Sequence, residues 1–155
     1  MCWYVYIATS EPLKEVIFTE NLPKTGERPP SLHFRPVMED EMDAYRSLFK
    51  GNYLYYVGSN TGCSCGLECN YEIWWAEDGV EQKELIDDAS PSALLEFLKS
   101  HPQKEPLEMY AVYETECWQL PLHHVVIPIK KNAQNDFVAL QTRQFYTFYV
   151  ESLID

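Results

Sequence analysis

Short apolar runs separated by turns rich in proline and glycine divide most of the chain into candidate strands. Runs of about four to eight residues that are rich in aromatic and β-branched side chains are typical of strands. The run at residues 3–8 is apolar throughout, which predicts a strand buried on both faces. Pro36 lacks a backbone donor and therefore favours an edge or a strand end. The pattern predicts strands at residues 3–8, 31–37, 53–57, 71–75, 107–114, 124–129 and 143–150, with a short edge strand at 16–18.

A helix-like spacing replaces this pattern at residues 38–50. Met38, Met42, Tyr45 and Phe49 recur every three or four residues, which places them on one face of a helix. The acidic residues 39–41 occupy the first turn, where the helix dipole favours negative charge. We therefore predict a helix here, with this stripe facing the core.

Two further segments favour helices. Ser90 followed by Pro91 is typical of a helix start, with serine as the N-cap and proline in the first turn. Leu94 and Leu98 belong to the apolar stripe of that helix, which we expect to end near His101. Residues 81–88 are predicted to form a short third helix.

Strands mixed with helices in this order predict an α+β fold. We expect one mixed or antiparallel sheet of about five to seven strands, with two or three helices. The 155 residues fit a single domain, 1–155, because no repeat or linker divides them.

The charge excludes some classes of partner. Twelve Lys and Arg against twenty-four Asp and Glu give a net charge of −12, which disfavours binding to nucleic acid or to an anionic membrane surface. No stretch approaches the ~20 apolar residues that span a bilayer. The five cysteines are an odd number, and the first residues show no secretory signal. We expect an acidic cytoplasmic protein with reduced thiols, whose partner is a small molecule or another protein.

The segment with the most candidate chemistry follows the predicted strand at 53–57. A turn, 58–62, leads into Cys63-Ser-Cys65-Gly66, and Cys69 follows. Zinc sites use four cysteine or histidine ligands, with knuckles spaced C-x(2–4)-C. Cys65 and Cys69 have this spacing, whereas Cys63 does not. Zinc is therefore one possible cofactor.

A zinc site would need ligands from elsewhere in the chain, because no second knuckle is present. The candidates are single residues that only the fold could bring to the turn. They are His33, Cys117, His123 and His124.

A second hypothesis is that Cys63 or Cys65 acts as a nucleophile in a thiol-dependent enzyme or redox protein. That chemistry requires a lowered thiol pKa, yet no Lys or Arg lies between Lys50 and Lys83. A third hypothesis is purely architectural, with glycines for tight turns and small cysteines where bulk would clash, in a structural or interaction protein. Cys2 fits a small apolar residue at a strand edge.

The opening 1–9, the turn 56–66, the strand 107–113 and the aromatic C-terminus together resemble a family of small bacterial proteins of uncharacterised function. In that family a Gly-Cys-x-Cys-Gly turn follows a strand. The resemblance extends to Cys63 and Cys65, with Cys69 outside the shared pattern, and implies no particular activity. The first expectation is therefore a metal ion or small ligand bound at residues 58–69, with the thiol and architectural hypotheses as alternatives.

Overall fold

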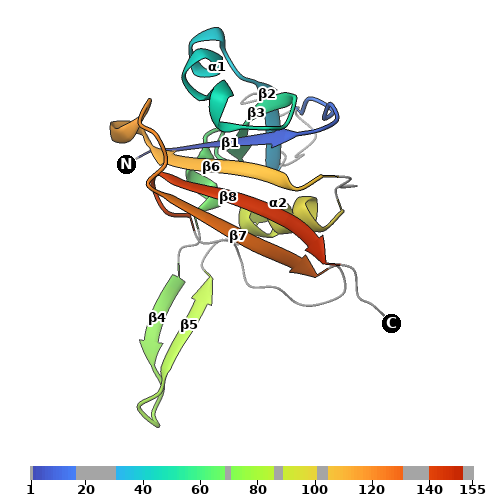
Figure 1. Cartoon of the computed structure of the whole chain (residues 1–155). Helices are drawn as coiled ribbons and strands as arrows, with labels where there is room; N and C mark the ends of the chain where they lie inside the picture. The colour runs from blue at the N-terminus through green and yellow to red at the C-terminus, as the bar shows by residue number, and fades with distance from the viewer. Residues whose placement is uncertain are drawn as a thin grey trace, which may run out of the picture.

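The computed structural model places most of the chain in one sheet flanked by helices (Figure 1). It describes residues 2–16, 31–68, 71–85, 89–100, 105–130 and 140–151, without the side chains of 71–75, 82–85, 130 and 150–151.

The main sheet has six strands in the order β2-β3-β1-β6-β8-β7. Every neighbouring pair is antiparallel except β7 and β8, which are parallel. The sheet is thus mixed and, with its two α-helices, confirms the predicted α+β class. The strands are β1 (Trp3–Thr9), β2 (Leu32–Pro36), β3 (Tyr53–Ser59), β6 (Leu107–Tyr113), β7 (His123–Lys130) and β8 (Gln144–Glu151).

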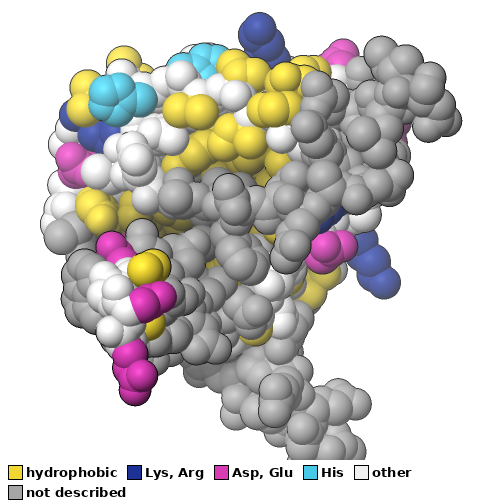
Figure 2. Space-filling view, turned by 90° about the horizontal axis from the view of Figure 1, so that it is seen from below, with side chains coloured by type: hydrophobic (Ala, Val, Ile, Leu, Met, Phe, Trp, Pro, Cys, Tyr) yellow, Lys and Arg dark blue, Asp and Glu magenta, His cyan; other side chains and the backbone are white. Residues whose placement is uncertain are grey.

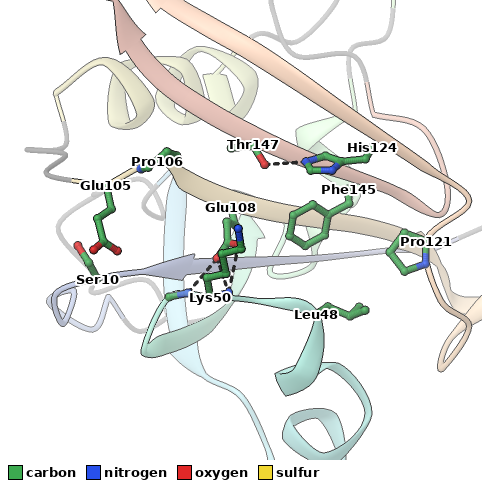
Figure 3. Close-up of a pocket in the computed structure, with 11 residues that line it drawn as sticks. Ser10, Leu48, Lys50, Glu105, Pro106, Glu108, Pro121, His124, Phe145 and Thr147 are labelled. Atoms are coloured by element: carbon green, nitrogen blue, oxygen red, sulfur yellow. Dashed lines mark hydrogen bonds between the residues drawn. The ribbon is translucent and has the colours of Figure 1, made fainter.

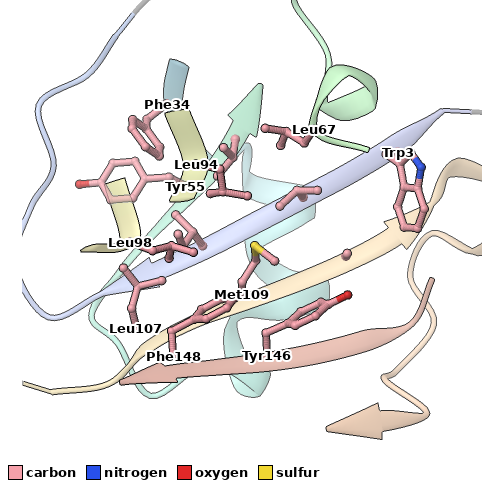
Figure 4. Close-up of a cluster of buried hydrophobic side chains, with 14 of the residues drawn as sticks. Trp3, Phe34, Tyr55, Leu67, Leu94, Leu98, Leu107, Met109, Tyr146 and Phe148 are labelled. Carbon is pink, nitrogen blue, oxygen red and sulfur yellow. The ribbon is translucent and has the colours of Figure 1, made fainter. Parts of the chain in front are cut away.

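One face of the sheet packs against helix α2 (Ala89–Ser100). Leu94 and Leu98 of this helix meet Ile7 and Met109 from the central strands, and all four side chains are fully buried. Leu67, from a 3-10 turn after β3, points into the same core (Figure 4). Burying a large apolar side chain contributes about 1.5–3 kcal/mol, so this core fixes both the helix and the turn on the sheet.

The opposite face is covered over part of its width by helix α1 (Glu39–Tyr45) and a 3-10 turn, Arg46–Leu48. Tyr45 and Phe49 pack there against Tyr6, Tyr56 and Tyr110. The central strand β1 therefore has neighbours on both faces, which explains its unbroken apolar sequence.

Strands β4 (Tyr71–Trp75) and β5 (Glu81–Leu85) form a separate antiparallel hairpin that projects from the main sheet (Figure 1). The predicted helix at 81–88 is therefore wrong over 81–85, and residues 86–88 lie outside the described part. The Asp78-Gly79 turn, with Gly79 at φ 77°, closes the hairpin and pairs Trp75 with Glu81. Pairing across this turn outweighs the weak helical pattern of the second strand.

Two local predictions also need correction. Met38 does not join the buried stripe, because it is the N-cap of α1 and its side chain is 57% exposed. Ser90 is not an N-cap, because α2 already begins at Ala89 and the Ser90 hydroxyl instead bonds Asn60. Val16 forms a single bridge to Phe34, while residues 17, 18 and 101 are outside the described ranges.

No helix within the described ranges has both the length and the apolar character needed to cross a membrane.

Candidate thiol site

The turn after β3 is closed by the side chain of one serine. The Ser59 hydroxyl donates to the carbonyl of Cys63 at 2.7 Å and accepts the backbone N–H groups of Thr61 and Gly66. The Ser59 N–H also bonds the Cys63 carbonyl at 2.8 Å. The Ser59 hydroxyl therefore bonds backbone groups of three other residues of the turn and holds the turn in this conformation.

The structure explains why both ends of the Gly-Cys-x-Cys-Gly turn are glycine. Gly62 has φ 90°, a region that side chains other than glycine rarely adopt. Gly66 lies so close to Ser59 that a Cβ on it would be 2.3 Å from the Ser59 hydroxyl oxygen. The Gly-Cys-x-Cys-Gly segment, residues 62–66, is thus a tightly packed turn.

Ser64 joins the turn to the sheet. Its buried hydroxyl donates to the carbonyl of Val57 at 2.6 Å and accepts the N–H of Val5 at 3.0 Å. Its own N–H donates to the Tyr56 hydroxyl. Ser64 therefore bridges β1 and β3 beyond their last direct pair, Tyr6 with Tyr56, and fixes the cysteines on either side of it.

These contacts bring three thiols together. The Cys63 and Cys65 thiols lie close enough for each to shift the pKa of the other, and the thiol of Cys2, which precedes β1, also raises the pKa of Cys65. The Thr61 hydroxyl lies 3.5 Å from the Cys63 sulfur. Cys63 and Cys65 are partly exposed and Cys2 is exposed, so the cluster is open to reagents.

The environment separates the pKa values of the two turn thiols. Burial raises the pKa of Cys63, but hydrogen bonds from the Thr61 hydroxyl, the Cys65 thiol and backbone N–H groups lower it more. For Cys65, burial and the hydrogen bond to Cys63 raise the pKa to about 11. The arrangement favours a thiolate on Cys63 over one on Cys65, and no Lys or Arg of the described residues is among the causes of these pKa shifts.

A metal site gains no support from the described residues. Among them, no three side chains of His, Cys, Asp or Glu are placed to hold a metal ion. Cys69, which has the knuckle spacing to Cys65, lies outside the described ranges. The zinc site therefore stays a prediction of the sequence.

The other predicted ligands do not contact the thiols. β7 lies four strands from β3, so at a strand spacing of ~4.8 Å the start of β7, with His123 and His124, is roughly 19 Å away. Cys117 follows β6 on the α1 side, where burial and Glu114 raise its pKa. His33 does reach the turn, but it bonds the backbone of Ser59 and Gly62.

Cys2 is the residue that the sequence interpretation missed. The isolated position suggested a small apolar side chain, whereas the thiol is exposed and lies near enough to Cys65 to raise the pKa of that thiol. The antiparallel pairing of β1 with β3 places the start of one strand beside the end of the other. The pairing of β1 with β3 is thus what places Cys2 near the turn, and the spacing of the cysteines along the sequence does not reveal it.

A larger hollow lies away from the thiols. It is a groove of about 580 Å³ between the segment after α1 and the sheet, lined by residues that include Lys50, Glu108, His124 and Phe145 (Figure 3). No residue of the 58–68 turn lines it. This groove therefore gives no support to the expectation of a ligand pocket at the turn.

The buried carboxylate in this groove, that of Glu108, bonds the backbone of a neighbouring segment. Glu108 is 7% exposed, and its oxygens accept the backbone N–H groups of Lys50 and Gly51 at 2.9 Å (Figure 3). It therefore ties the segment after α1 to β6. Across the groove, His124 bonds the Thr147 hydroxyl at 2.7 Å.

The edge strand β7 is open to solvent. His123 and His124 are exposed, as are Leu122 and Val126, and the view from below shows histidine beside hydrophobic side chains (Figure 2). Pro128 lies on this edge and removes one backbone donor from it, which disfavours pairing with another chain.

Comparisons with family models, with curated proteins and with solved structures found no match to this chain. The resemblance to a bacterial family therefore stays a prediction, and the candidate function depends on the geometry of the site.

Proposed function

We propose that the turn carries out thiol–disulfide exchange, with Cys63 as the attacking thiol and Cys65 as the resolving thiol. The observation that supports this most strongly is the contact between the two thiols, in which the pKa of Cys63 is lowered and that of Cys65 is raised. The thiolate is the reactive form of cysteine. The lower pKa of Cys63 therefore suits this thiol to the first attack, and the higher pKa of Cys65 suits that thiol to the second.

In the first step the Cys63 thiolate attacks one sulfur of a substrate disulfide. A bond forms between Cys63 and that sulfur, the substrate S–S bond breaks, and the other half leaves as a thiolate. The Thr61 hydroxyl, 3.5 Å from the Cys63 sulfur, is placed to donate a hydrogen bond to the Cys63 anion before attack. Partial exposure of Cys63 gives the substrate access.

In the second step Cys65 loses its proton to the departing thiolate or to water. Its sulfur then attacks the Cys63 sulfur of the mixed disulfide, and the second half of the substrate leaves as a thiolate that takes a proton from water. Two electrons pass from the pair to the substrate, which is reduced to two thiols, and the protein keeps a Cys63–Cys65 disulfide. The high pKa of Cys65 keeps it protonated until Cys63 has reacted.

The test is the rate of alkylation by iodoacetamide at each cysteine as a function of pH, resolved by peptide mass spectrometry. We expect the Cys63 midpoint to lie below the ordinary thiol value of ~8.5. The midpoint of Cys65 should lie near 11, and that of Cys117 above the ordinary value, because burial raises both. Reaction of all three cysteines with one common midpoint would contradict the proposal.

A matched pair of variants separates the hydrogen bond from the packing. Thr61→Val removes the hydroxyl that faces Cys63 while keeping the shape, so the Cys63 midpoint should rise. Thr61→Ser keeps the hydroxyl and should leave the midpoint near that of the unmodified protein. An equal midpoint in the two variants would show that Thr61 does not tune the thiol.

A further inference from the structure

A second, smaller cavity lies on the α1 side of the sheet. It encloses about 280 Å³, and its walls come from β1, β2, α1 and the turn after β6. We call it the aromatic pocket, and the residues that the argument uses are Tyr4, Tyr6, Arg35, Met38, Asp40 and Trp118, with Glu41 and Glu114 at the same cavity. Cys63 and Cys65 do not line it.

The walls are aromatic faces and a thioether. Tyr6 is buried and lies at a tilt against Tyr45, with the ring centres 4.8 Å apart, and Tyr45 stacks on Trp118 at 5.8 Å and 16°. Trp118 and Met38 remain 54% and 57% exposed. Two large apolar side chains at the rim of the cavity are therefore more than half exposed to solvent.

Trp118 is fixed in this position by its backbone. Its φ of 70° is unusual for a bulky residue, and its N–H donates to the Tyr45 hydroxyl at 2.7 Å. Tyr45 therefore holds both the ring and the main chain of Trp118, so the indole is preorganised at the pocket.

The charges at the pocket are unbalanced. Three carboxylates (Asp40, Glu41 and Glu114) face one guanidinium, Arg35, which leaves an excess of two negative charges. Arg35 is already engaged, because it pairs with Glu41 at 2.9 Å and lies 4.2 Å from the centre of the Tyr56 ring. Among the described residues, no Lys or Arg forms an ion pair with Asp40 or Glu114.

We infer that the aromatic pocket binds a small alkylated ammonium cation. Aromatic faces attract such a cation through their quadrupoles, and its methyl groups suit the apolar rim of Trp118 and Met38. Asp40 and Glu114 supply the opposite charge. The Arg35–Tyr56 contact is the same kind of interaction made within the chain. Tyr4 and Trp118 also line the pocket, and neither forms such a contact with a described Lys or Arg.

The experiment compares choline with its neutral isostere, 3,3-dimethylbutan-1-ol, by calorimetry on the full chain. The two probes have the same shape, so the difference between their affinities measures the contribution of the positive charge to binding. We expect choline to bind about tenfold more tightly, the ratio that a cation–π contact of ordinary strength gives. Equal affinity for the two probes, or no binding of choline, would overturn the inference.

Two variants locate the binding. Trp118→Leu should weaken choline binding about tenfold and leave the weak binding of the neutral isostere nearly unchanged. Asp40→Asn combined with Glu114→Gln, changes at the pocket rim that keep the side-chain shapes, should weaken choline several-fold if the fold is intact by circular dichroism. Unchanged choline affinity in the correctly folded double variant would place the cation elsewhere and overturn the inference.

Discussion

At the scale of the residue, hydroxyl groups organise the candidate site more than the cysteines do. Ser59 closes the turn, Ser64 attaches it to β1 and β3, and Thr61 faces the Cys63 sulfur. Neither Ser59 nor Ser64 stands out in the sequence, because serine is common in turns of every kind. Their roles depend on the distances that folding creates.

Gly58 provides a test of how closely β2 and β3 pack. It is paired with His33, and a Cβ at this position would lie 1.9 Å from the imidazole ring. Gly58→Ala should therefore lower the free energy of unfolding by about 3 kcal/mol, because a buried ring must move. Urea denaturation measures this loss.

Gly79→Ala is the matched control. Gly79 has φ 77°, but no atom lies within 4 Å of a Cβ there. We expect a loss of about 1 kcal/mol, from backbone strain alone. If Gly58→Ala cost no more than the control, the contact between His33 and Gly58 would not be as tight as the structure shows.

At the scale of the element, the strands could be predicted and one helix could not. The apolar runs at 3–8 and 107–114 gave β1 and β6 nearly to the residue, since each contributes side chains to two buried faces. The helix expected at 81–88 is instead strand β5 over 81–85, because the Asp78-Gly79 turn pairs it with β4. A polar strand without periodicity is identified only through its partner.

Glu108 tests how the segment after α1 is attached to the sheet. Its carboxylate accepts the N–H groups of Lys50 and Gly51, and Glu108→Ala would leave both without an acceptor. The expected loss of unfolding free energy is about 2–3 kcal/mol, since hydrogen bonds to a charged group are the stronger kind. Guanidinium denaturation gives the value.

Glu105→Ala provides the comparison, because Glu105 is an exposed residue that lines the same groove. Its loss should change stability by less than about 0.5 kcal/mol. A similar cost for the two variants would mean that the attachment does not depend on the Glu108 carboxylate.

At the scale of the whole molecule, the candidate site lies where distant segments meet. Cys2 and the 63–65 turn are some sixty residues apart in sequence, and the pairing of β1 with β3 brings them together. The same topology places His123 and His124 at the far edge of the sheet. The resemblance to a bacterial family singled out Cys63 and Cys65 as a pair, whereas the spacing of cysteines in the sequence could not supply Cys2 or assess the distant histidines.

The most direct test of the central proposal is a redox titration of the thiols. The protein is equilibrated in buffers of reduced and oxidised glutathione, free thiols are blocked, and the chain is cut after Glu68 to separate the 63–65 pair from Cys69. We predict that the peptide with Cys63 and Cys65 loses two hydrogens as a single two-electron step while Cys117 stays a free thiol. If no intramolecular disulfide forms between Cys63 and Cys65 at any glutathione ratio, thiol–disulfide exchange is not the function of this turn.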